Sequence, residues 1–410
     1  MLVACGDTAP GTPGVDAGAG APDAGPPAQN DAGATPNPPP PVTDDELSRT
    51  TGCAGVYNPD QVLDYHIEMD PGDWNALLAD QTNAVYFPAE LSCADQAPIT
   101  VGIRRKRSGG AVKVGLKIDV NAIVDGQTYY SLKKLSLENG VSEGTTEDGA
   151  EVKDHLAEYL GWRLMQRAGV ISSRAVFARI DVNGEMLGVY ANVEQVDKRF
   201  LESRLGDDSG WLYKKSGSED DGLKTHETDG LDDPYDDYFC FWASGGNDCA
   251  VPPEETLTAE LPQKLDIDQM LRMGAVNALI SNTDAPLIKD NNYYYYDWSQ
   301  GRVYMPWDLD TTMKEHLDVF STGDIGNGES FADVLFTSWE DDYDTVLTML
   351  LENELGLDTI LDEIARAEAV AADAFASDPF VSGTMSDAAG ALTSYWTTRH
   401  AEVAAQVAAH

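Results

Sequence analysis

The sequence predicts a mixed α+β protein whose N-terminal half is rich in strands and whose C-terminal half is rich in helices. Up to Val193 most apolar segments alternate with period two, which is typical of half-buried strands. From Asp266 onward apolar residues recur at helical spacing instead. Residues 6–42 are an Ala/Gly/Pro/Asp tract without periodicity, which predicts a disordered tether. We therefore expect a tether over 1–48 and one domain over 49–410, with an N-lobe to about 195 and a C-lobe from about 196.

Six segments of the N-terminal half are expected to be strands because they are rich in β-branched and aromatic residues. They are residues 62–68, 99–107, 112–120, 129–137, 175–182 and 187–193. Asn183 and Gly184 between the last two favour a tight hairpin turn. A long amphipathic helix is expected from about Glu151 to Ala168, with Gly169 as its stop.

Helical spacing in the C-terminal half predicts helices over residues 266–281, 342–355, 357–375 and 386–408. Between the first two, residues 293–296 and 303–307 are β-prone, and 297–301 have turn composition. We expect an antiparallel hairpin here. Its four successive tyrosines are interpreted as a half-buried strand rather than an exposed stacking platform.

The open end of this hairpin brings together side chains that carry oxygen atoms. With the turn near Ser299, Asn291 and Asn292 face Trp307 and Asp308 across the ladder. Asp284 follows the predicted helix 266–281 and can reach the same point. Such oxygen ligands suit a hard cation such as Mg²⁺, so the pattern predicts a metal site.

The alternative is that these acids mark an ordinary solvated strand end. Asp and Glu make up 70 of the 410 residues, so a pair such as Asp308 and Asp310 arises easily by chance. The prediction of a metal site therefore depends on the combination of the hairpin, the asparagines and Asp284.

The charge of the chain excludes some partners and points to another. The net charge of −43 argues against nucleic acid or an anionic membrane surface. Residues 101–134 differ, because they hold eight basic residues against two acids, a local charge of +6. Such a basic segment is expected where a compact anion such as a nucleotide phosphate binds; a solvated, salt-bridged strand pair is the alternative. The basic residues are Arg104, Arg105, Lys106, Arg107, Lys113, Lys117, Lys133 and Lys134.

The cysteines and the N-terminus predict export. "MLVAC" matches the small-residue pattern of a lipoprotein signal, with Cys5 as the lipid-bearing residue, although no charged or long apolar region precedes it. The remaining four cysteines allow three pairings, and we favour Cys53 with Cys93 and Cys240 with Cys249. No apolar run is long enough to span a bilayer, so we expect membrane attachment only through the anchor.

Several catalytic motifs are absent from the sequence. It contains no H-E-x-x-H, no G-K-[ST] and no G-x-G-x-x-G after a predicted strand. "GVSEG" around Ser142 matches G-x-S-x-G but lacks the strand before it and the helix after it that a nucleophile elbow needs. The acidic segment 218–238 lacks the spacing of a calcium loop, so we interpret it as a solvated insertion.

Four motifs, in order, resemble the spore-coat-protein-H-like (CotH) family of atypical, secreted protein kinases. The resemblance spans about Tyr65 to the C-terminus. The motifs are "IRRKRSGGAVKVGLKIDV", "VFARIDVNGEMLGVYANVEQVDKRFL", "GWLYKK", and "NTD" with "NNYYYY" and "MPWDLD". The resemblance implies a two-lobed, atypical protein-kinase-like fold. This chain departs from the family at Ser108, where a glycine is usual, and at Asn291, where a histidine is often found.

The resemblance also implies roles for residues of the last motif. Asp284 would be the catalytic acid-base residue. Asn292 and Asp308 would hold Mg²⁺ or Mn²⁺, and Asp310 is a further candidate metal ligand beside them.

For ATP, the resemblance implies a strand lysine that contacts the phosphates. Lys117 is the first choice and Lys113 its alternative, because residues four apart on a strand share a face. Arg107 is a further candidate in the same basic segment. Glu194 would lie where the lobes connect, so that it or the following backbone faces the adenine. The helix should supply a carboxylate that orients the lysine: Glu158 fits, with Glu151 and Asp154 as alternatives.

We therefore predict a lipid-anchored, exported kinase that transfers the γ-phosphate of ATP to Ser/Thr hydroxyls of surface or envelope proteins, using a divalent metal. The alternative is an inactive adhesion or scaffolding module on a kinase-like fold. In that case aromatic clusters such as residues 293–296 and "DYFCFW" would bind glycans or proteins.

Overall fold

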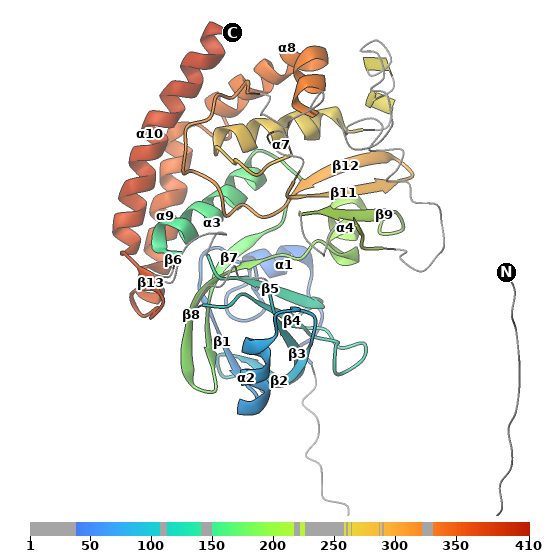
Figure 1. Ribbon diagram of the computed structural model, residues 1–410, viewed down its shortest axis with the longest axis vertical. Coiled ribbons are helices and arrows are strands. Elements are labelled where there is room, and N and C mark those ends of the chain that lie inside the picture. The colour runs from blue at the N-terminus through green and yellow to red at the C-terminus, as the bar shows by residue number, and fades with distance from the viewer. Residues whose placement is uncertain are drawn as a thin grey trace, which may run out of the picture. The chain divides into compact units, whose positions relative to one another are not determined.

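A computed structural model describes most of the chain from residue 38 onward. The described residues are 38–106, 113–140, 150–216, 222–225, 258–259, 261–263, 265–286, 288, 291–321 and 331–410, without the side chains of 331–337. Figure 1 shows a strand-rich N-terminal part and a helix-rich C-terminal part, so the predicted α+β class is confirmed. Each part has its own hydrophobic core.

The N-terminal strands form a closed barrel with the order β1-β2-β3-β4-β5-β8-β7. Neighbouring strands are antiparallel except β1 and β7, which are parallel. The hairpin turn predicted at Asn183 and Gly184 is confirmed, since both residues have positive φ values, 54° and 78°. The bounds are β1 (Leu63–Glu68), β2 (Phe87–Cys93), β3 (Ile99–Arg105), β4 (Leu116–Asp119), β5 (Lys134–Glu138), β7 (Ala175–Val182) and β8 (Glu185–Val193).

The predicted strand over residues 112–120 is shorter in the structure. β4 begins only at Leu116, so Lys113 lies outside it and does not share a strand face with Lys117. β2 was not predicted from the sequence. Its buried residues alternate, but they include the small Ala89 and Cys93, and Pro88 interrupts the strand pattern.

The predicted disulfide between Cys53 and Cys93 is present, with an S–S distance of 2.05 Å and a Cα–Cα distance of 6.0 Å. It joins the segment before β1 to the end of β2. Cys5, Cys240 and Cys249 lie outside the described residues, as does Ser142.

A short helix, α1 (Asp44–Arg49), belongs to the compact unit that spans Pro36–His410. Thr43 caps α1, its Leu47 is fully buried, and its Asp44 forms an ion pair with Arg174. The boundary predicted at residue 49 therefore falls at the end of a packed helix. The capping box formed by Thr43 and Glu46 is the sequence signal for its start.

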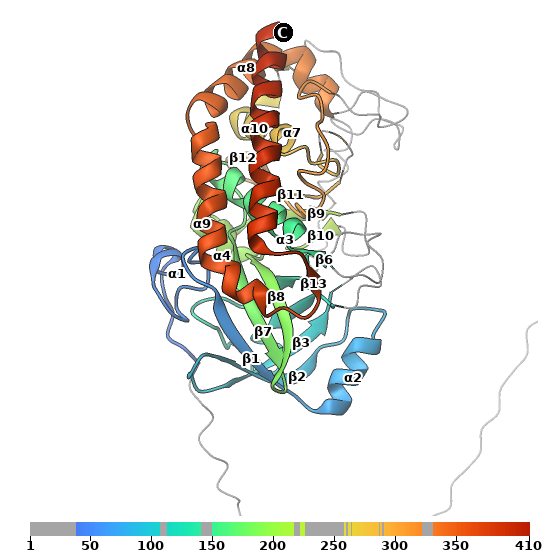
Figure 2. The same cartoon turned by 90° about the vertical axis from the view of Figure 1, so that its left-hand side faces the viewer.

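The helices of the C-terminal part surround the second core together with α3. Their predicted positions agree closely, except that α8 starts earlier and is kinked at Trp339. Figure 2 shows α9 and α10 side by side. Among the described residues no helix is long and apolar enough to cross a membrane. Helix α2 (Pro71–Ala79) lies between β1 and β2 in the chain. The bounds of the other helices are α3 (Val152–Arg167), α4 (Lys198–Leu205), α7 (Ile267–Leu279), α8 (Phe331–Glu352), α9 (Leu357–Ala376) and α10 (Met385–Ala409).

The predicted hairpin is β11 (Tyr293–Trp298) and β12 (Gly301–Pro306), in register from Tyr293 opposite Pro306 to Trp298 opposite Gly301. It belongs to a four-stranded sheet, β10-β9-β11-β12, with β9 (Trp211–Lys215) and β10 (Gly222–Leu223). The four tyrosines are buried, as expected for a core strand. A parallel pair, β6 (Ala150–Glu151) and β13 (Val381–Ser382), connects the start of α3 to the segment before α10.

Candidate active site

Helix α7 leads into a loop that is fixed by Asn282. The Asn282 side chain donates to Asn277 Oδ1 at 3.0 Å, and its own Oδ1 accepts from the backbone N–H of Asp284 at 3.1 Å. The same oxygen accepts from Thr311 Oγ1 at 3.1 Å, in the loop after β12. One buried amide therefore holds both loops that carry the predicted acids. The sequence motif "NTD" contains Asn282, but its role was not predicted.

The structure brings Asp284 together with both asparagines before β11. Asp284 Oδ2 accepts from Asn291 Nδ2 at 3.0 Å and from Asn292 Nδ2 at 2.8 Å. The strand ends meet, because the backbone N–H of Trp307 donates to Asn292 O at 3.1 Å. Since Asn292 donates through Nδ2, a cation would bind it through Oδ1.

The backbone is unusual at both strand ends. Asn292 and Asp308 have φ values of 56° and 52°, in the left-handed region that costs non-glycine residues of order 1 kcal/mol or more. Such residues persist where the surrounding structure holds them, and they cluster at functional sites. At the open end of the hairpin, Asn292 lies opposite Trp307, and Asp308 is the next residue on that strand.

Carboxylates from three elements crowd around this point. Burial, together with the charges of Asp308, Glu158 and Asp284, raises the pKa of Asp310 to about 9. Burial and Asp308 also raise the pKa of Glu158, to about 7. Glu158 comes from α3 and is buried, and its Oε2 has no hydrogen-bond partner among the described residues. The site therefore carries excess negative charge on this side.

Lys106, directly after β3, lies between these acids and a group of basic side chains. Its Nζ donates to Ser136 Oγ at 3.0 Å and pairs with Glu138. Burial and the neighbouring Lys214 lower the pKa of Lys106 to about 7, while Asp308 and Glu158 act in the opposite direction. The charges of Asp308 and Glu158 therefore both act on Lys106. From the sequence, Lys106 was predicted to belong to the basic segment but not to contact the phosphates.

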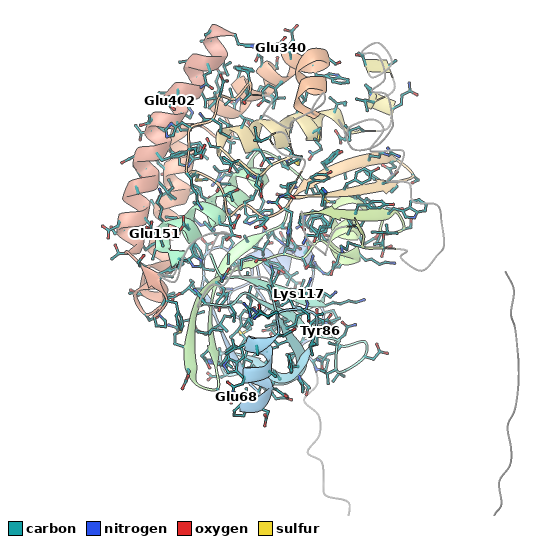
Figure 3. All side chains as sticks on the ribbon, in the orientation of Figure 1. Glu68, Tyr86, Lys117, Glu151, Glu340 and Glu402 are labelled. Carbon is teal, nitrogen blue, oxygen red and sulfur yellow. A yellow bond between two sulfur atoms is a disulfide. The ribbon has the colours of Figure 1, made fainter. Side chains whose placement is uncertain are left out.

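Lys117 belongs to the same basic group. It lies on β4 opposite Arg104 on β3 and Ser136 on β5. Burial and the charges of Lys134, Lys106, Arg104 and Lys214 lower its pKa well below the usual value. Lys214, on β9, has its Nζ 5.1 Å from the centre of the Trp307 ring. Figure 3 shows Lys117 on the barrel.

The other predicted nucleotide-binding residues lie in different surroundings. Lys113 is fully buried, with Nζ 2.8 Å from Asp378 Oδ2. The Glu194 carboxylate is held by the guanidinium groups of Arg174, Arg199 and Arg204. Arg107 lies outside the described residues.

The structure distinguishes the three acids that were candidates for orienting the lysine, Glu151, Asp154 and Glu158. Glu151 is the exposed N-cap residue, and Asp154 lies 3.9 Å from Lys314. Of the three, Glu158 is the one whose charge acts on Lys106.

The donor set fits a cation that is only partly bound by protein. Within the described part of the chain, no group of three or more His, Cys, Asp or Glu residues is arranged to hold a metal by itself. Asn292, Asp308 and Asp310 nevertheless offer an amide and carboxylate oxygens. Mg²⁺ usually takes one or two carboxylates and completes its shell with water and phosphate oxygens, so these residues fit a metal that arrives with a nucleotide.

A family model described as "CotH kinase protein" matches residues 114–402 of this chain. No curated protein matches it. Among solved structures, the Helicobacter pylori proinflammatory kinase CtkA is 12% identical with a TM-score of 0.35, and the match covers 74% of this chain and 93% of CtkA. A chain of the Shewanella oneidensis MR-1 toxin–antitoxin complex of HipA, HipB and operator DNA is 13% identical with a TM-score of 0.29, over 63% of this chain and 58% of that one.

Proposed function

Because the chain belongs to the CotH kinase family, whose model covers more than half of it, we propose that it is an ATP-dependent protein kinase. It would transfer the γ-phosphate of ATP to Ser or Thr hydroxyls with the help of Mg²⁺ or Mn²⁺. The observation that carries this proposal is the position of Lys106, whose Nζ lies 5.7 Å from the centre of the Trp307 ring, next to Asp308, and whose pKa responds to the charges of Glu158 and Asp308. Phosphoryl transfer needs such an arrangement, since it depends on positioning and charge compensation rather than covalent chemistry.

In this proposal Asp284 acts on the substrate hydroxyl, and Asp308 and Asp310 act on the metal. Asp284 orients the attacking hydroxyl and accepts its proton, and Asn291 and Asn292 fix its carboxylate through hydrogen bonds of 3.0 and 2.8 Å. Asn292 and Asp308, with Asp310 beside them, would hold the metal. When bound, the metal supplies positive charge that offsets the phosphate oxygens.

The phosphate-binding lysine in this proposal is Lys106, and Lys117 and Lys214 add positive charge in the same basic group. Glu158 is the helix carboxylate proposed to orient Lys106 when nucleotide binds, because its charge acts on that lysine; in the structure Lys106 pairs directly with Glu138. Lys113 has a different role, because Asp378 neutralises it. The Glu194 carboxylate is likewise occupied by arginines, so the backbone after Glu194 is the better candidate for the adenine.

We further propose that the protein acts outside the cytoplasm, attached by a lipid at Cys5, on proteins of the cell surface or envelope. The Cys53–Cys93 disulfide supports export, because such bonds persist in oxidising compartments.

The test is phosphate transfer from labelled ATP by the full chain with Cys5→Ser, in Mg²⁺ or Mn²⁺, to itself or to a generic protein acceptor. We expect labelling by this protein and none by Asp284→Asn. The matched control is Asp268→Asn, which removes an exposed carboxylate at the other end of the helix that leads to Asp284 and should label normally. Equal labelling by Asp284→Asn would overturn the assignment.

A thermal-shift titration separates the kinase from the inactive module. Saturating ATP with metal, at about a hundred times its Kd, should stabilise a true site by roughly 2.7 kcal/mol. Absence of both labelling and stabilisation favours a non-catalytic surface protein. The burial of the four tyrosines of β11 removes one surface that such a module would use.

A further inference from the structure

The segment between α9 and α10 holds a buried acid that the proposed reaction does not use. Asp378 Oδ2 accepts from Lys113 Nζ at 2.8 Å and from the backbone N–H of Val189, on β8, at 2.7 Å. Its Oδ1 accepts from the N–H of Phe380 at 2.8 Å. Both side chains of the ion pair are fully buried. One carboxylate of the C-terminal part is therefore embedded in the barrel.

The barrel is shaped to receive this carboxylate. Lys113 Nζ also donates to Val189 O and lies 4.6 Å from the centre of the Tyr190 ring. Gly188 has a φ value of 116°, and a Cβ there would lie 2.6 Å from Asp378 Oδ2 and 2.8 Å from Lys113 Cε. Only glycine allows the backbone of β8 to approach the pair this closely.

Lys113 is connected in turn to the backbone of Lys106. The N–H of Lys106 donates to Gly115 O at 2.8 Å, two residues after Lys113. The intervening backbone is held on both sides, because Asn139 Nδ2 donates to Lys113 O at 2.7 Å and Tyr190 OH donates to Val114 O at 2.9 Å. The position of Lys113 therefore determines where the strand end that carries Lys106 lies.

The same C-terminal segment also fixes helix α3. Directly after Phe380, the strand β13 pairs in parallel with β6, Val381 with Ala150 and Ser382 with Glu151. Glu151 is the N-cap of α3, and Glu158 follows two turns later on that helix. Figure 3 shows Glu151 at this end of α3, while Glu402 marks the distant part of α10.

We propose that Asp378, through its ion pair with Lys113 and the adjoining β13, is a positioning residue that sets Lys106 and Glu158 at their working separation. The proposal rests on the proposed function, in which Lys106 binds phosphate and Glu158 orients it. Residues 378–382 contact β8 and the Lys113 side chain on one side and the start of the helix that carries Glu158 on the other. Lys113 is connected to Lys106 through Gly115, whose carbonyl accepts from the Lys106 N–H. A shift of either element changes the position of the lysine relative to the nucleotide.

The ion pair offers two kinds of variant that separate positioning from folding. Asp378→Asn keeps the shape of the side chain but leaves the buried Lys113 without a charged partner, which destabilises the fold. The double variant Lys113→Met with Asp378→Leu removes both charges, and replacing a buried pair by apolar residues is often neutral for stability. Val403→Ala is the matched control, because it removes a fully buried side chain near the far end of α10.

The experiment measures amide hydrogen exchange and ATP kinetics in the full-length variants. In Asp378→Asn and in the double variant we expect faster exchange of the Lys106 amide and of the amides from Ala150 to Leu156. In Val403→Ala, compared at equal distance from its melting temperature, these amides should exchange as in the unaltered protein. We also expect kcat/KM for ATP to fall by roughly a hundredfold in the two pair variants, with KM for ATP raised.

The outcomes separate the two proposals. If the double variant folds and keeps the native exchange of Lys106 and α3, the positioning role is overturned. It is also overturned if Val403→Ala changes exchange and KM as much as the pair variants do. If the unaltered protein neither binds ATP nor transfers phosphate, the proposed function fails by itself, and hydrogen exchange still decides whether Asp378 fixes the two elements.

Discussion

Two carboxylates, the buried Glu363 and the half-buried Asp310, have opposite electrostatic surroundings. Burial would raise the pKa of Glu363, but Arg163, Arg167 and Arg366 hold it below the usual value, with N–O distances of 2.8, 2.9 and 3.0 Å. Burial and its acidic neighbours together raise the pKa of Asp310 to about 9. The first carboxylate is compensated by the fold, whereas the second is surrounded by like charge.

This difference indicates what each region is for. The Glu363 cluster joins α9 to α3, and arginines compensate the charge of Glu363 without any ligand. In the candidate active site, acids crowd around Asp310 and basic residues crowd around Lys117. A metal ion on the acidic side and phosphates on the basic side would relieve both. We infer that the fold tolerates this repulsion because ligands compensate it.

The largest effect is expected from Asp308→Asn. Loss of a metal ligand removes several kcal/mol of transition-state stabilisation, which corresponds to about a thousandfold in kcat/KM for labelled ATP. The same change should raise the melting temperature of the ligand-free protein, because it removes a charge that repels Glu158 and Asp310. Active protein with unchanged stability would contradict the role of Asp308. Asp268→Asn, outside the site, serves as the control.

Glu363→Ala should have the largest effect on stability. Removing this carboxylate should cost about 1 to 3 kcal/mol, because its hydrogen bonds to Arg163, Arg167 and Arg366 are lost while these partly exposed arginines regain some hydration. Urea denaturation measures the free energy of unfolding, and Asp362→Ala, an exposed acid on the same helix, should change it by less than about 0.5 kcal/mol. Equal losses in both variants would show that the compensated cluster does not stabilise the fold.

Local sequence signals predicted the elements that local chemistry determines. Asn183 and Gly184 predicted the β7–β8 turn, and the β-prone runs on either side of Ser299 predicted the β11–β12 hairpin, with Asn292 and Asp308 at its ends. Asp284 also fell beside Asn292, because only a short loop separates the two residues. These residues are close in sequence, so periodicity and turn composition were sufficient.

The basic side of the site depends on contacts between distant segments, and the sequence did not resolve it. The partner of Lys113 lies 265 residues later, at Asp378, and no local pattern shows that this pair forms. Alternation alone placed Lys113 and Lys117 on one strand face, but the strand starts at Leu116. Lys106 is set apart from the other basic residues by the approach of Glu158 and Asp308, which is a property of the tertiary structure.

The pH dependence of stability should distinguish the two carboxylates. Asp310 has a pKa of about 9 when folded, against about 4 when unfolded, so the folded state binds more protons between these values. The free energy of unfolding should therefore fall as pH rises from 5 to 7 in ligand-free protein. The pKa of Lys106 is lowered to about 7, which makes the free energy of unfolding rise with pH. This opposite effect sets in only above that pH range.

Asp310→Asn should make this slope shallower, as measured by melting temperature from pH 5 to 7 without added metal. The part that remains comes from Glu158, whose pKa is also raised, to about 7. Glu363→Gln should leave it unchanged. The pKa of Glu363 is lowered, so its contribution is present at neutral pH and is lost only in acid, below about pH 4. If Glu363→Gln changed the slope from pH 5 to 7 and Asp310→Asn did not, the contrast between the two regions would be refuted.

The smallest effect is expected from Lys214→Met, which tests how far the uncompensated region extends. The charge of Lys214 helps to lower the pKa of Lys106 and of Lys117. Its Nζ lies over the rings of Trp307 and Tyr294. Its loss should raise KM for ATP by roughly tenfold or less, about 1 kcal/mol, and leave kcat nearly unchanged. Lys224→Met, on the same side of the small sheet but without a resolved effect on Lys106, is the matched control. A fall in kcat as large as that of Asp308→Asn would place Lys214 at the reacting phosphate and move the centre of the basic group from β3 to β9.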